Sequence, residues 1–205
     1  MGATDGIIAL LAGIRGCRAC LEQPHGKPLP HEPRPIIRAA ATARIAVCGQ
    51  APGTRVHASG VPFTDPSGDR LRDWMGVTAE EFYDEGRIAI VPMGFCFPGL
   101  DAKGSDLPPR KECAPLWRTR VFEGLTQLEL LLLVGRYAQD WHLGNRKVTL
   151  EATVRNGTQQ AQRPPNLPVI ALPHPSWRNS GWLKKNPWFA DEVLPDLRQR
   201  VRVLL

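Results

Sequence analysis

Four of the five cysteines occur as two spaced pairs, a pattern typical of metal binding. Cys17 and Cys20 form a C-x-x-C motif, and sixteen residues separate Cys96 from Cys113. Cys48 lies inside an apolar run and is most simply a small core residue. The chain starts without a basic secretory leader, so we expect no disulfide framework. Zinc and a 4Fe–4S cluster both accept four thiolates, and plain reduced thiols are a third alternative.

Glycine-rich and polar motifs directly follow short apolar runs. The run at residues 44–48 leads into GQAPG at residues 49–53, whose glycines allow a close approach of the backbone to a ligand. This turn matches neither the dinucleotide fingerprint nor a phosphate-binding P-loop. The run at residues 168–172 leads into PHPSWRN at residues 173–179. Ligands of open parallel sheets bind at the carboxyl ends of strands, so we expect the functional site among these loops.

The elements that position these motifs follow from the apolar pattern. Buried parallel strands are predicted at Arg44–Cys48, Arg87–Val91, Leu130–Val134 and Pro168–Leu172. Predicted helices cover residues 5–14, 67–76, 112–126, 136–143, 147–155 and 189–203, the last interrupted at Pro195. Five prolines make residues 23–38 an extended, irregular arm. The alternation predicts a three-layer α/β/α sandwich with a four-stranded parallel sheet, in one domain of 205 residues.

The overall charge permits a nucleic-acid partner without requiring one. The net charge is +6, and lysine and arginine side chains neutralise phosphates. No apolar run approaches the roughly 20 residues of a membrane span. We therefore expect a cytoplasmic, monomeric protein with no membrane contact and no obligate protein partner.

Taken in order, these motifs resemble the uracil-DNA glycosylase superfamily, in particular its iron–sulfur branch, family four. That branch has an N-terminal C-x-x-C, a strand ending in GEAPG, a G-x-P-F motif, two further cysteines and a strand ending in HPS. The matching stretches here are Cys17–Cys20, Gly49–Gly53, Gly60–Phe63, Cys96 with Cys113, and His174–Ser176. The resemblance covers nearly the whole chain, from Cys17 to about Asn179. It implies a monofunctional DNA N-glycosylase without lyase activity, acting on DNA that contains a damaged or deaminated base.

The resemblance also implies roles for individual residues. A structural 4Fe–4S cluster would be ligated by Cys17, Cys20, Cys96 and Cys113. Phe63 would stack on a base flipped out of DNA, and His174 would donate to the base oxygen that gains charge. Other contacts to the base would come from Gly49, Gln50, Ala51, Met93 and Gly94. DNA would be bound by Ser176, Trp177, Arg178, Asn179, Lys184 and Lys185, although a solvated helix face is the alternative for the two lysines.

Two positions depart from the pattern of this branch. Gln50 replaces a glutamate and can orient water but cannot act as a general base, so His57 and Asp65 are further candidates for this role. Pro92 replaces an asparagine that contacts the uracil edge. Backbone groups of Met93–Phe95 would then have to substitute, or the enzyme would act on another lesion such as a deaminated purine.

The expected function is therefore hydrolysis of the N-glycosidic bond of uracil or another deaminated base. One alternative is a catalytically silent DNA-binding protein with the same fold, which the substitutions at Gln50 and Pro92 favour. A second is an unrelated α/β hydrolase with a zinc knot, which the absence of a G-x-S-x-G motif disfavours.

Overall fold

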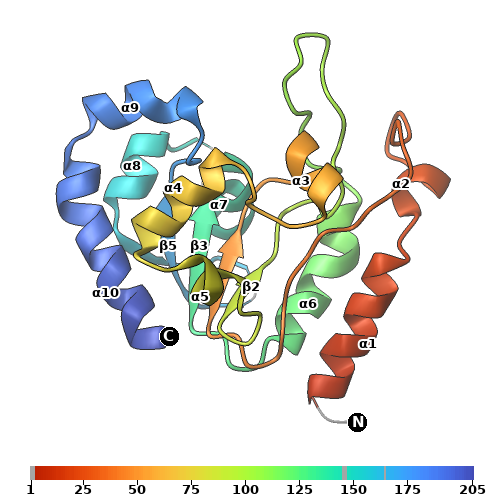
Figure 1. Cartoon of the computed structure of the whole chain (residues 1–205), viewed down its shortest axis with the longest axis horizontal. Helices are drawn as coiled ribbons and strands as arrows, with labels where there is room; N and C mark the ends of the chain where they lie inside the picture. Colours follow the sequence, from red (N-terminus) through yellow and green to blue (C-terminus); the bar gives the residue numbers. More distant parts are fainter. Residues whose placement is uncertain (1–2, 145–146, 164) are drawn as a thin grey trace.

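A five-stranded sheet forms the centre of the protein in the computed structural model, which describes residues 3–144, 147–163 and 165–205 (Figure 1). Residues 1–2 lie outside the described residues; they begin the predicted N-terminal region, residues 1–43, in which a helix, the C-x-x-C motif and the proline-rich arm pack on the rest of the single domain. The strand order is β2-β1-β3-β5-β4. The strands are β1 (Ile45–Cys48), β2 (Ile88–Ile90), β3 (Leu130–Val134), β4 (Thr158–Gln160) and β5 (Pro168–Leu172).

All four predicted strands are present and parallel, and the sheet has one strand more than predicted. β4 pairs with β5 in the antiparallel direction, with Thr158 opposite Ile170 and Gln160 opposite Pro168. Its sequence, TQQ, is polar and is not buried. A short polar edge strand lacks the apolar run by which buried strands are recognised, and the sequence therefore gave no sign of it.

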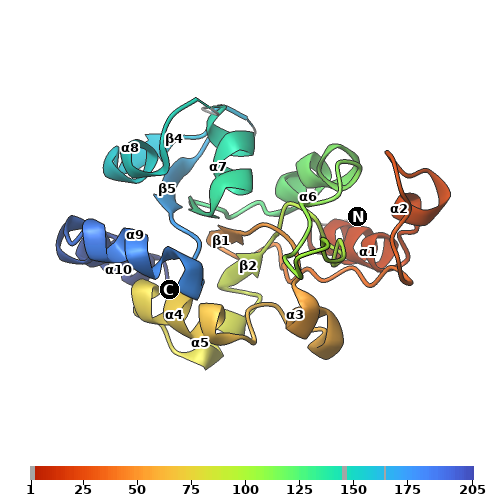
Figure 2. The ribbon, with the colours of Figure 1, turned by 90° about the horizontal axis from the view of Figure 1, so that it is seen from above.

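Helices cover both faces of the sheet, which confirms the predicted α/β/α layers (Figure 2). Ala46 and Cys48 of β1 point into one core, shared with α1 (Ala3–Arg15), α6 (Thr119–Gly124) and α7 (Arg136–Leu143). Ile45 and Val47 point into the other core, shared with α4 (Pro66–Met75), α5 (Ala79–Tyr83) and α10 (Leu194–Leu204). This alternation follows from the two-residue period of a strand.

Every predicted helical segment contains helix, in two cases in two parts. Residues 112–126 contain the π-helical turn η1 (Ala114–Arg118) followed by α6, and residues 189–203 contain η3 (Phe189–Val193) followed by α10. Pro195 lies in the first turn of α10, where a missing N–H costs nothing. The predicted helix at residues 147–155 is α8 (Leu150–Arg155).

Several short helices were not predicted. They are α2 (Ala19–Glu22), α3 (Thr54–Ser59), α5, the 3-10 turn η2 (Trp177–Asn179) and α9 (Ser180–Lys185). None exceeds six residues, which is too short for helical periodicity to appear in a sequence. Among the described residues, no helix has the length and apolar character needed to cross a membrane.

The proline-rich arm is irregular, as predicted, and runs beside β2. Arg38 and Ile90 form an isolated antiparallel bridge through two backbone hydrogen bonds of 3.1 and 2.7 Å. Further along, the Ile36 amide donates to the Phe95 carbonyl at 2.7 Å. The arm thus covers the open edge of β2 and brings the N-terminal cysteines close to the segment that follows this strand. We call that segment, residues 91–113, the β2–η1 segment.

The β2–η1 segment includes the yellow-green loop that rises highest in Figure 1. In this loop, the Leu107 amide donates to the Gly99 carbonyl at 2.9 Å, and the Asp101 amide donates to the Ser105 carbonyl at 2.8 Å. The loop is therefore a hairpin-like turn, and it stands above the turn at residues 49–53 that follows β1.

Candidate active site

Two adjoining hollows lie at the carboxyl ends of β1, β2 and β5, where the sequence predicts the functional site. The inner cavity has about 570 Å³ of empty space, and the outer cleft has about 1460 Å³, both partly open to solvent. The residues that line both hollows are Gln50, Ala51, Asp65, Ser67, Asp106 and His174. A ligand in the inner cavity would therefore be continuous with one in the outer cleft.

The GQAPG turn forms one wall of the inner cavity, with all five of its residues in the lining. Two hydrogen bonds hold it against the β2–η1 segment: the Met93 amide donates to the Gly49 carbonyl at 2.9 Å, and the Gly94 amide donates to the Gln50 carbonyl at 3.0 Å. These two amides are therefore engaged within the protein, and neither residue lines the inner cavity. The predicted contact of Met93 and Gly94 with a base thus finds no geometric support, whereas Pro92 does line the cavity.

Phe63 lines the inner cavity in an unusual backbone conformation. Its φ of 56° is the only positive value among non-glycine residues in the described part of the chain. The Tyr83 hydroxyl lies 2.9 Å from the Pro62 carbonyl and 3.0 Å from the Phe63 carbonyl, and Arg72 also donates to the latter at 3.2 Å. A Cβ at Gly68 would lie 1.8 Å from the Phe63 carbonyl oxygen, so only glycine fits there. Strain of this kind persists where the surroundings enforce it, as at many functional sites.

The Phe63 ring is held by contacts at its edge and at its tip. It meets Phe82 of α5 in a T-shaped contact, with ring centroids 5.8 Å apart. A Cβ at Gly49 would lie 3.4 Å from the ring, so the first glycine of the turn allows the strand end to pass close to it. The ring is therefore fixed beside the turn without any ligand present.

His174 lines both hollows from the loop after β5, and its hydrogen bonds define its tautomer. The Ser176 amide donates to Nδ1 at 3.2 Å, so Nδ1 is an acceptor and the proton of the neutral ring is on Nε2. Within the part of the chain that the structure describes, Nε2 has no hydrogen-bond partner. Burial lowers the pKa of His174, although Asp65 and Asp106 oppose this effect. The side chain is therefore a neutral donor facing the site.

Two carboxylates line the hollows and differ in their surroundings. Asp65 caps α4: its Oδ1 accepts from the Ser67 hydroxyl at 2.5 Å and from the Gly68 amide at 3.2 Å. Asp106, in the β2–η1 segment, has no side-chain hydrogen bond among the described residues. Burial raises the pKa of Asp106, and Arg178 and His174 act in the opposite direction. The sequence offered no sign of Asp106, because no motif surrounds it and only the fold brings it to the site.

The two other polar candidates, His57 and Gln50, make their contacts with residues away from the inner cavity. His57 does not line the inner cavity; its ring lies 4.4 Å from that of His31 and 5.6 Å from that of Phe97. Burial lowers the pKa of His57, and the neighbouring His31 and Arg34 lower it further. Gln50 lines both hollows, and its Nε2 donates to the Leu107 carbonyl at 3.4 Å.

The outer cleft carries positive charge and one highly exposed aromatic ring. Trp177 is 77% exposed, with the Arg178 guanidinium carbon 6.0 Å from its ring centroid. Of the residues predicted to bind DNA, those that line the cleft are Ser176, Trp177, Arg178 and Asn179. Lys184 and Lys185, at the end of α9, do not line it.

Two arginines of the outer cleft were not predicted from the sequence. Arg55 lies on α3 and Arg70 on α4, and Arg70 donates to the Ser176 carbonyl at 3.2 Å. No motif marks either residue, and the direction that each faces depends on how its helix packs. Three arginines thus line the cleft together with Asp65 and Asp106, and arginines beside an exposed tryptophan suit a nucleic-acid backbone and its bases.

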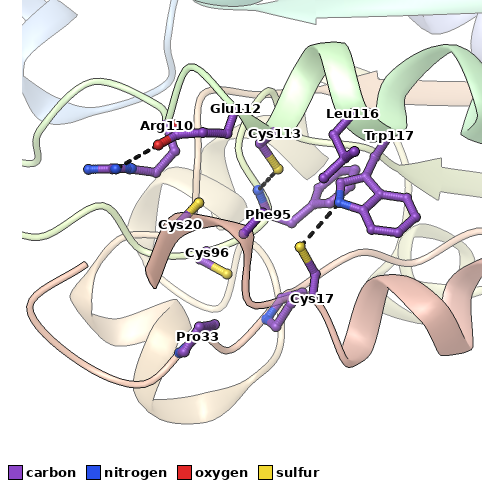
Figure 3. A pocket seen from close by; sticks show the side chains of 12 residues that line it. Cys17, Cys20, Pro33, Phe95, Cys96, Arg110, Glu112, Cys113, Leu116 and Trp117 are labelled. Atoms are coloured by element: carbon purple, nitrogen blue, oxygen red, sulfur yellow. Dashed lines mark hydrogen bonds and ion pairs between the residues drawn. The ribbon is translucent and has the colours of Figure 1, made fainter. Parts of the chain in front are cut away.

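The two cysteine pairs meet at a separate hollow of about 380 Å³, the cysteine cavity (Figure 3). Its lining includes all four predicted metal ligands: Cys17, Cys20, Cys96 and Cys113. The Trp117 indole N–H donates to Cys17 Sγ, and the Phe95 amide donates to Cys113 Sγ, each at 3.3 Å. The thiols form no disulfide, and burial raises the pKa of Cys96 and of Cys113 to about 12. A nearby cation would therefore be needed to hold them as thiolates.

Two kinds of metal centre use four thiolate ligands. Within residues 3–144, 147–163 and 165–205, no three His, Cys, Asp or Glu side chains converge as the ligand shell of one metal ion. Zinc requires its four ligands at close range around a single ion. In an iron–sulfur cube each thiolate binds a different iron, which separates the ligands more widely. Four thiols around one hollow, two of them accepting N–H groups, are donors that either kind of centre could use.

A comparison with known protein families agrees with this architecture. The family model of the uracil DNA glycosylase superfamily matches residues 37–198. The chain therefore belongs to this superfamily, whose members are DNA glycosylases, hydrolases that act on DNA. The matched range includes Phe63 and His174 but not the C-x-x-C motif, so membership of the iron–sulfur branch stays a prediction.

Proposed function

We propose that this protein is a base-excision DNA glycosylase, which hydrolyses the N-glycosidic bond of uracil or another deaminated base. The observation that carries the proposal is one juxtaposition: the fixed Phe63 ring and the His174 Nε2–H donor line the same inner cavity. This cavity adjoins a basic cleft with an exposed tryptophan. Such an arrangement suits a nucleotide flipped from DNA held along the cleft.

In the proposed reaction, the flipped base stacks on Phe63 and accepts a hydrogen bond from His174. As the bond between the base and the sugar breaks, negative charge develops on the departing base. A fixed N–H donor stabilises that charge more strongly in the transition state than in the ground state. Burial lowers the pKa of His174, which favours the neutral ring with its proton on Nε2.

The proposed substrate range follows from the wall formed by Pro92. Proline offers no side-chain hydrogen bond, and the amides of Met93 and Gly94 are already engaged by the GQAPG turn. This wall therefore lacks a donor that would select uracil alone. We propose that deaminated purines, hypoxanthine and xanthine, are accepted as well as uracil.

We further propose that the four cysteines hold a 4Fe–4S cluster, as in the iron–sulfur branch. When bound, the cluster would cross-link the N-terminal arm to the β2–η1 segment without taking part in base release. Measured iron and acid-labile sulfide in freshly purified protein test this assignment. About four irons and four sulfides per chain would support it, whereas stoichiometric zinc without iron would overturn it.

We also propose a reducing, cytoplasmic location, which the five free cysteines support. We further propose that the protein is a monomer and has no lyase activity.

Base release from labelled oligonucleotides tests the proposed activity. Single and double strands carrying uracil, hypoxanthine or xanthine are incubated with the protein, and the abasic sites are cleaved with alkali. His174→Ala and Phe63→Ala should each abolish most release, whereas His25→Ala, an exposed histidine outside both hollows, should not. Cleavage of the strand without alkali would contradict the absence of lyase activity.

A second candidate, a catalytically silent DNA-binding protein, is favoured by one observation. Gln50 in the turn is not a general base, and its amide nitrogen is bonded to the Leu107 carbonyl. The same assay separates the candidates: binding of lesion-containing DNA with no release from any substrate would favour the silent protein.

A further inference from the structure

The proposed hydrolysis requires a group that accepts a proton from the attacking water, and Gln50 cannot do this. We propose that the Asp106 carboxylate is this group. The inference rests on the proposed function and extends it, because it assigns the missing base to a loop that carries no recognisable motif.

The first argument is the place of Asp106 in the fold. It lines both hollows, at the base of the hairpin-like loop of the β2–η1 segment. It pairs with Leu100 in an isolated antiparallel bridge, flanked by the backbone bonds that close the loop. The next residue, Leu107, accepts a hydrogen bond from Gln50 at 3.4 Å, which ties the loop to the GQAPG turn. Asp106 is therefore anchored on both sides at the mouth of the inner cavity.

The second argument is its contact with the last glycine of the turn. A Cβ at Gly53 would lie 3.3 Å from Asp106 Oδ2 and 4.0 Å from Oδ1. Asp106 as a whole residue is exposed, but its carboxylate thus lies against the turn. Gly53 has ordinary backbone angles, so the missing side chain matters for space and not for conformation. Gly53 leaves room for the Asp106 carboxylate beside the turn. In the iron–sulfur branch the carboxylate belongs to the turn itself, at the position of Gln50, three residues before Gly53.

The third argument is availability. Oδ1 of Asp65 already accepts two hydrogen bonds as the cap of α4, which leaves this carboxylate fewer lone pairs for a water molecule. Asp106 makes no side-chain hydrogen bond to any described residue, so its oxygens are free to bind water. His57, the third candidate, does not line the inner cavity.

The charged groups around Asp106 agree with this role. His174 follows β5, Arg178 lies in η2, Asp65 caps α4, and Arg55 of α3 lines the outer cleft. Burial raises the pKa of Asp106, which makes it a better proton acceptor than a free aspartate. The negative charge of Asp106 would also stabilise the positive charge that develops on the sugar.

The proton and electron pairs balance in the proposed step. A water oxygen bonds to the anomeric carbon while the bond from that carbon to the base nitrogen breaks, and the base leaves with the bonding electron pair. Asp106 accepts one proton from the water, so the sugar gains a hydroxyl group. That proton then passes through solvent to the departed base, which restores the carboxylate and neutralises the base.

The test compares Asp106→Asn with the wild type and with Asp191→Asn, an exposed aspartate outside both hollows. Under single-turnover conditions, Asp106→Asn should lower base release by about 100-fold or more, as loss of a general base does. Asp191→Asn should leave it unchanged. The wild-type rate should fall on acidification as Asp106 takes up a proton, and Asp106→Asn should lack this limb. Gly53→Ala, whose methyl group presses on the carboxylate, should give an intermediate loss.

A binding measurement gives a readout that loss of folding would not imitate. Oligonucleotides with a cationic pyrrolidine or a neutral tetrahydrofuran at the abasic position mimic the charged and uncharged sugar. The wild type should prefer the cationic form, and Asp106→Asn should lose this preference while it still binds the neutral form. The assignment of Asp106 as the general base would be overturned if Asp106→Asn released the base at a rate within about threefold of the wild type, or if it kept the preference for the cation. Either result would leave the proposed glycosylase function standing. Wild-type protein that releases no base would overturn the proposed function, and the assignment with it.

Discussion

The inner cavity and the cysteine cavity are built from neighbouring parts of the same β2–η1 segment, yet their polar groups differ in state. In the cysteine cavity, two of the four sulfurs accept N–H groups, and all the cysteines but the half-buried Cys17 are buried. In the inner cavity, His174 Nε2 and the Asp106 carboxylate have no partners among the described residues. Both groups line solvent-accessible hollows, where a ligand can reach them. The comparison shows one region whose polar groups are engaged within the protein and another whose polar groups are available to a ligand.

The largest expected effects are a loss of base release from a change in the inner cavity and a loss of stability from a change in the cysteine cavity. His174→Ala should lower base release by roughly 10²–10³-fold, as loss of a transition-state donor does, with little change in melting temperature. Cys96→Ser should instead lower the free energy of unfolding by roughly 3–5 kcal/mol if the proposed cluster is bound and is lost in this variant. Release assays and thermal melts on both variants check this. A catalytic loss without a stability loss in Cys96→Ser would break the comparison.

An intermediate effect should come from His142 of α7, which is fully buried against Arg118. Its Nε2 lies 2.8 Å from a nitrogen of the buried Arg118, and that arginine donates to the carbonyls of Val91 and Pro92. Burial, with Arg118 second, lowers the pKa of His142 to about 2. In the unfolded chain the ring takes up a proton near its ordinary pKa, whereas in the folded protein it does not.

The contribution of neutral His142 to the free energy of unfolding is therefore fully present above the pKa of the histidine in the unfolded chain. It is lost as the pH falls from there toward the lower pKa of His142 in the folded protein. We expect a decline of about 1.4 kcal/mol per pH unit below about pH 6.5 from this group. Urea unfolding between pH 7 and pH 4 measures the slope. The His142→Gln variant should have a shallower slope by nearly one proton, and an unchanged slope would contradict the prediction.

The smallest expected effect concerns the support of the stacking ring. Tyr83→Phe removes a hydroxyl that lies within hydrogen-bond distance of the Pro62 and Phe63 carbonyls. We expect a stability loss of about 1 kcal/mol, the usual value for one hydrogen bond, and a base-release loss of only a few fold. Arg72 still donates to the Phe63 carbonyl in this variant. A loss as large as that of Phe63→Ala would mean that Tyr83 itself takes part in the reaction.

The sequence predicts best what repeats along the chain and worst what depends on packing. Its apolar runs locate β1, β2, β3 and β5, and the motifs that follow β1 and β5 do line one site. The polar strand β4 has no such run. Asp106, Arg55 and Arg70 could not be selected, because only the packing of the helices and of the β2–η1 segment turns them toward the site.

Backbone hydrogen bonding was also hidden from the sequence. Met93 and Gly94 follow the predicted second strand and were natural candidates to contact a base. The structure instead pairs their amides with the carbonyls of Gly49 and Gln50. Which backbone amides remain free to bind a ligand depends on how the two loops pack against each other. The residue types in the sequence do not reveal this packing.

The left-handed backbone of Phe63 has a consequence for affinity. Because Gly68, Tyr83 and Arg72 fix the Phe63 carbonyl before any nucleic acid arrives, the ring loses little conformational entropy when a base stacks on it. The energy of stacking is then available to offset the unpairing of the base from its partner. Because the Phe63 ring is held in place beside the turn, the space next to it is also fixed. This fixed space sets an upper limit to the size of the base that can stack on the ring.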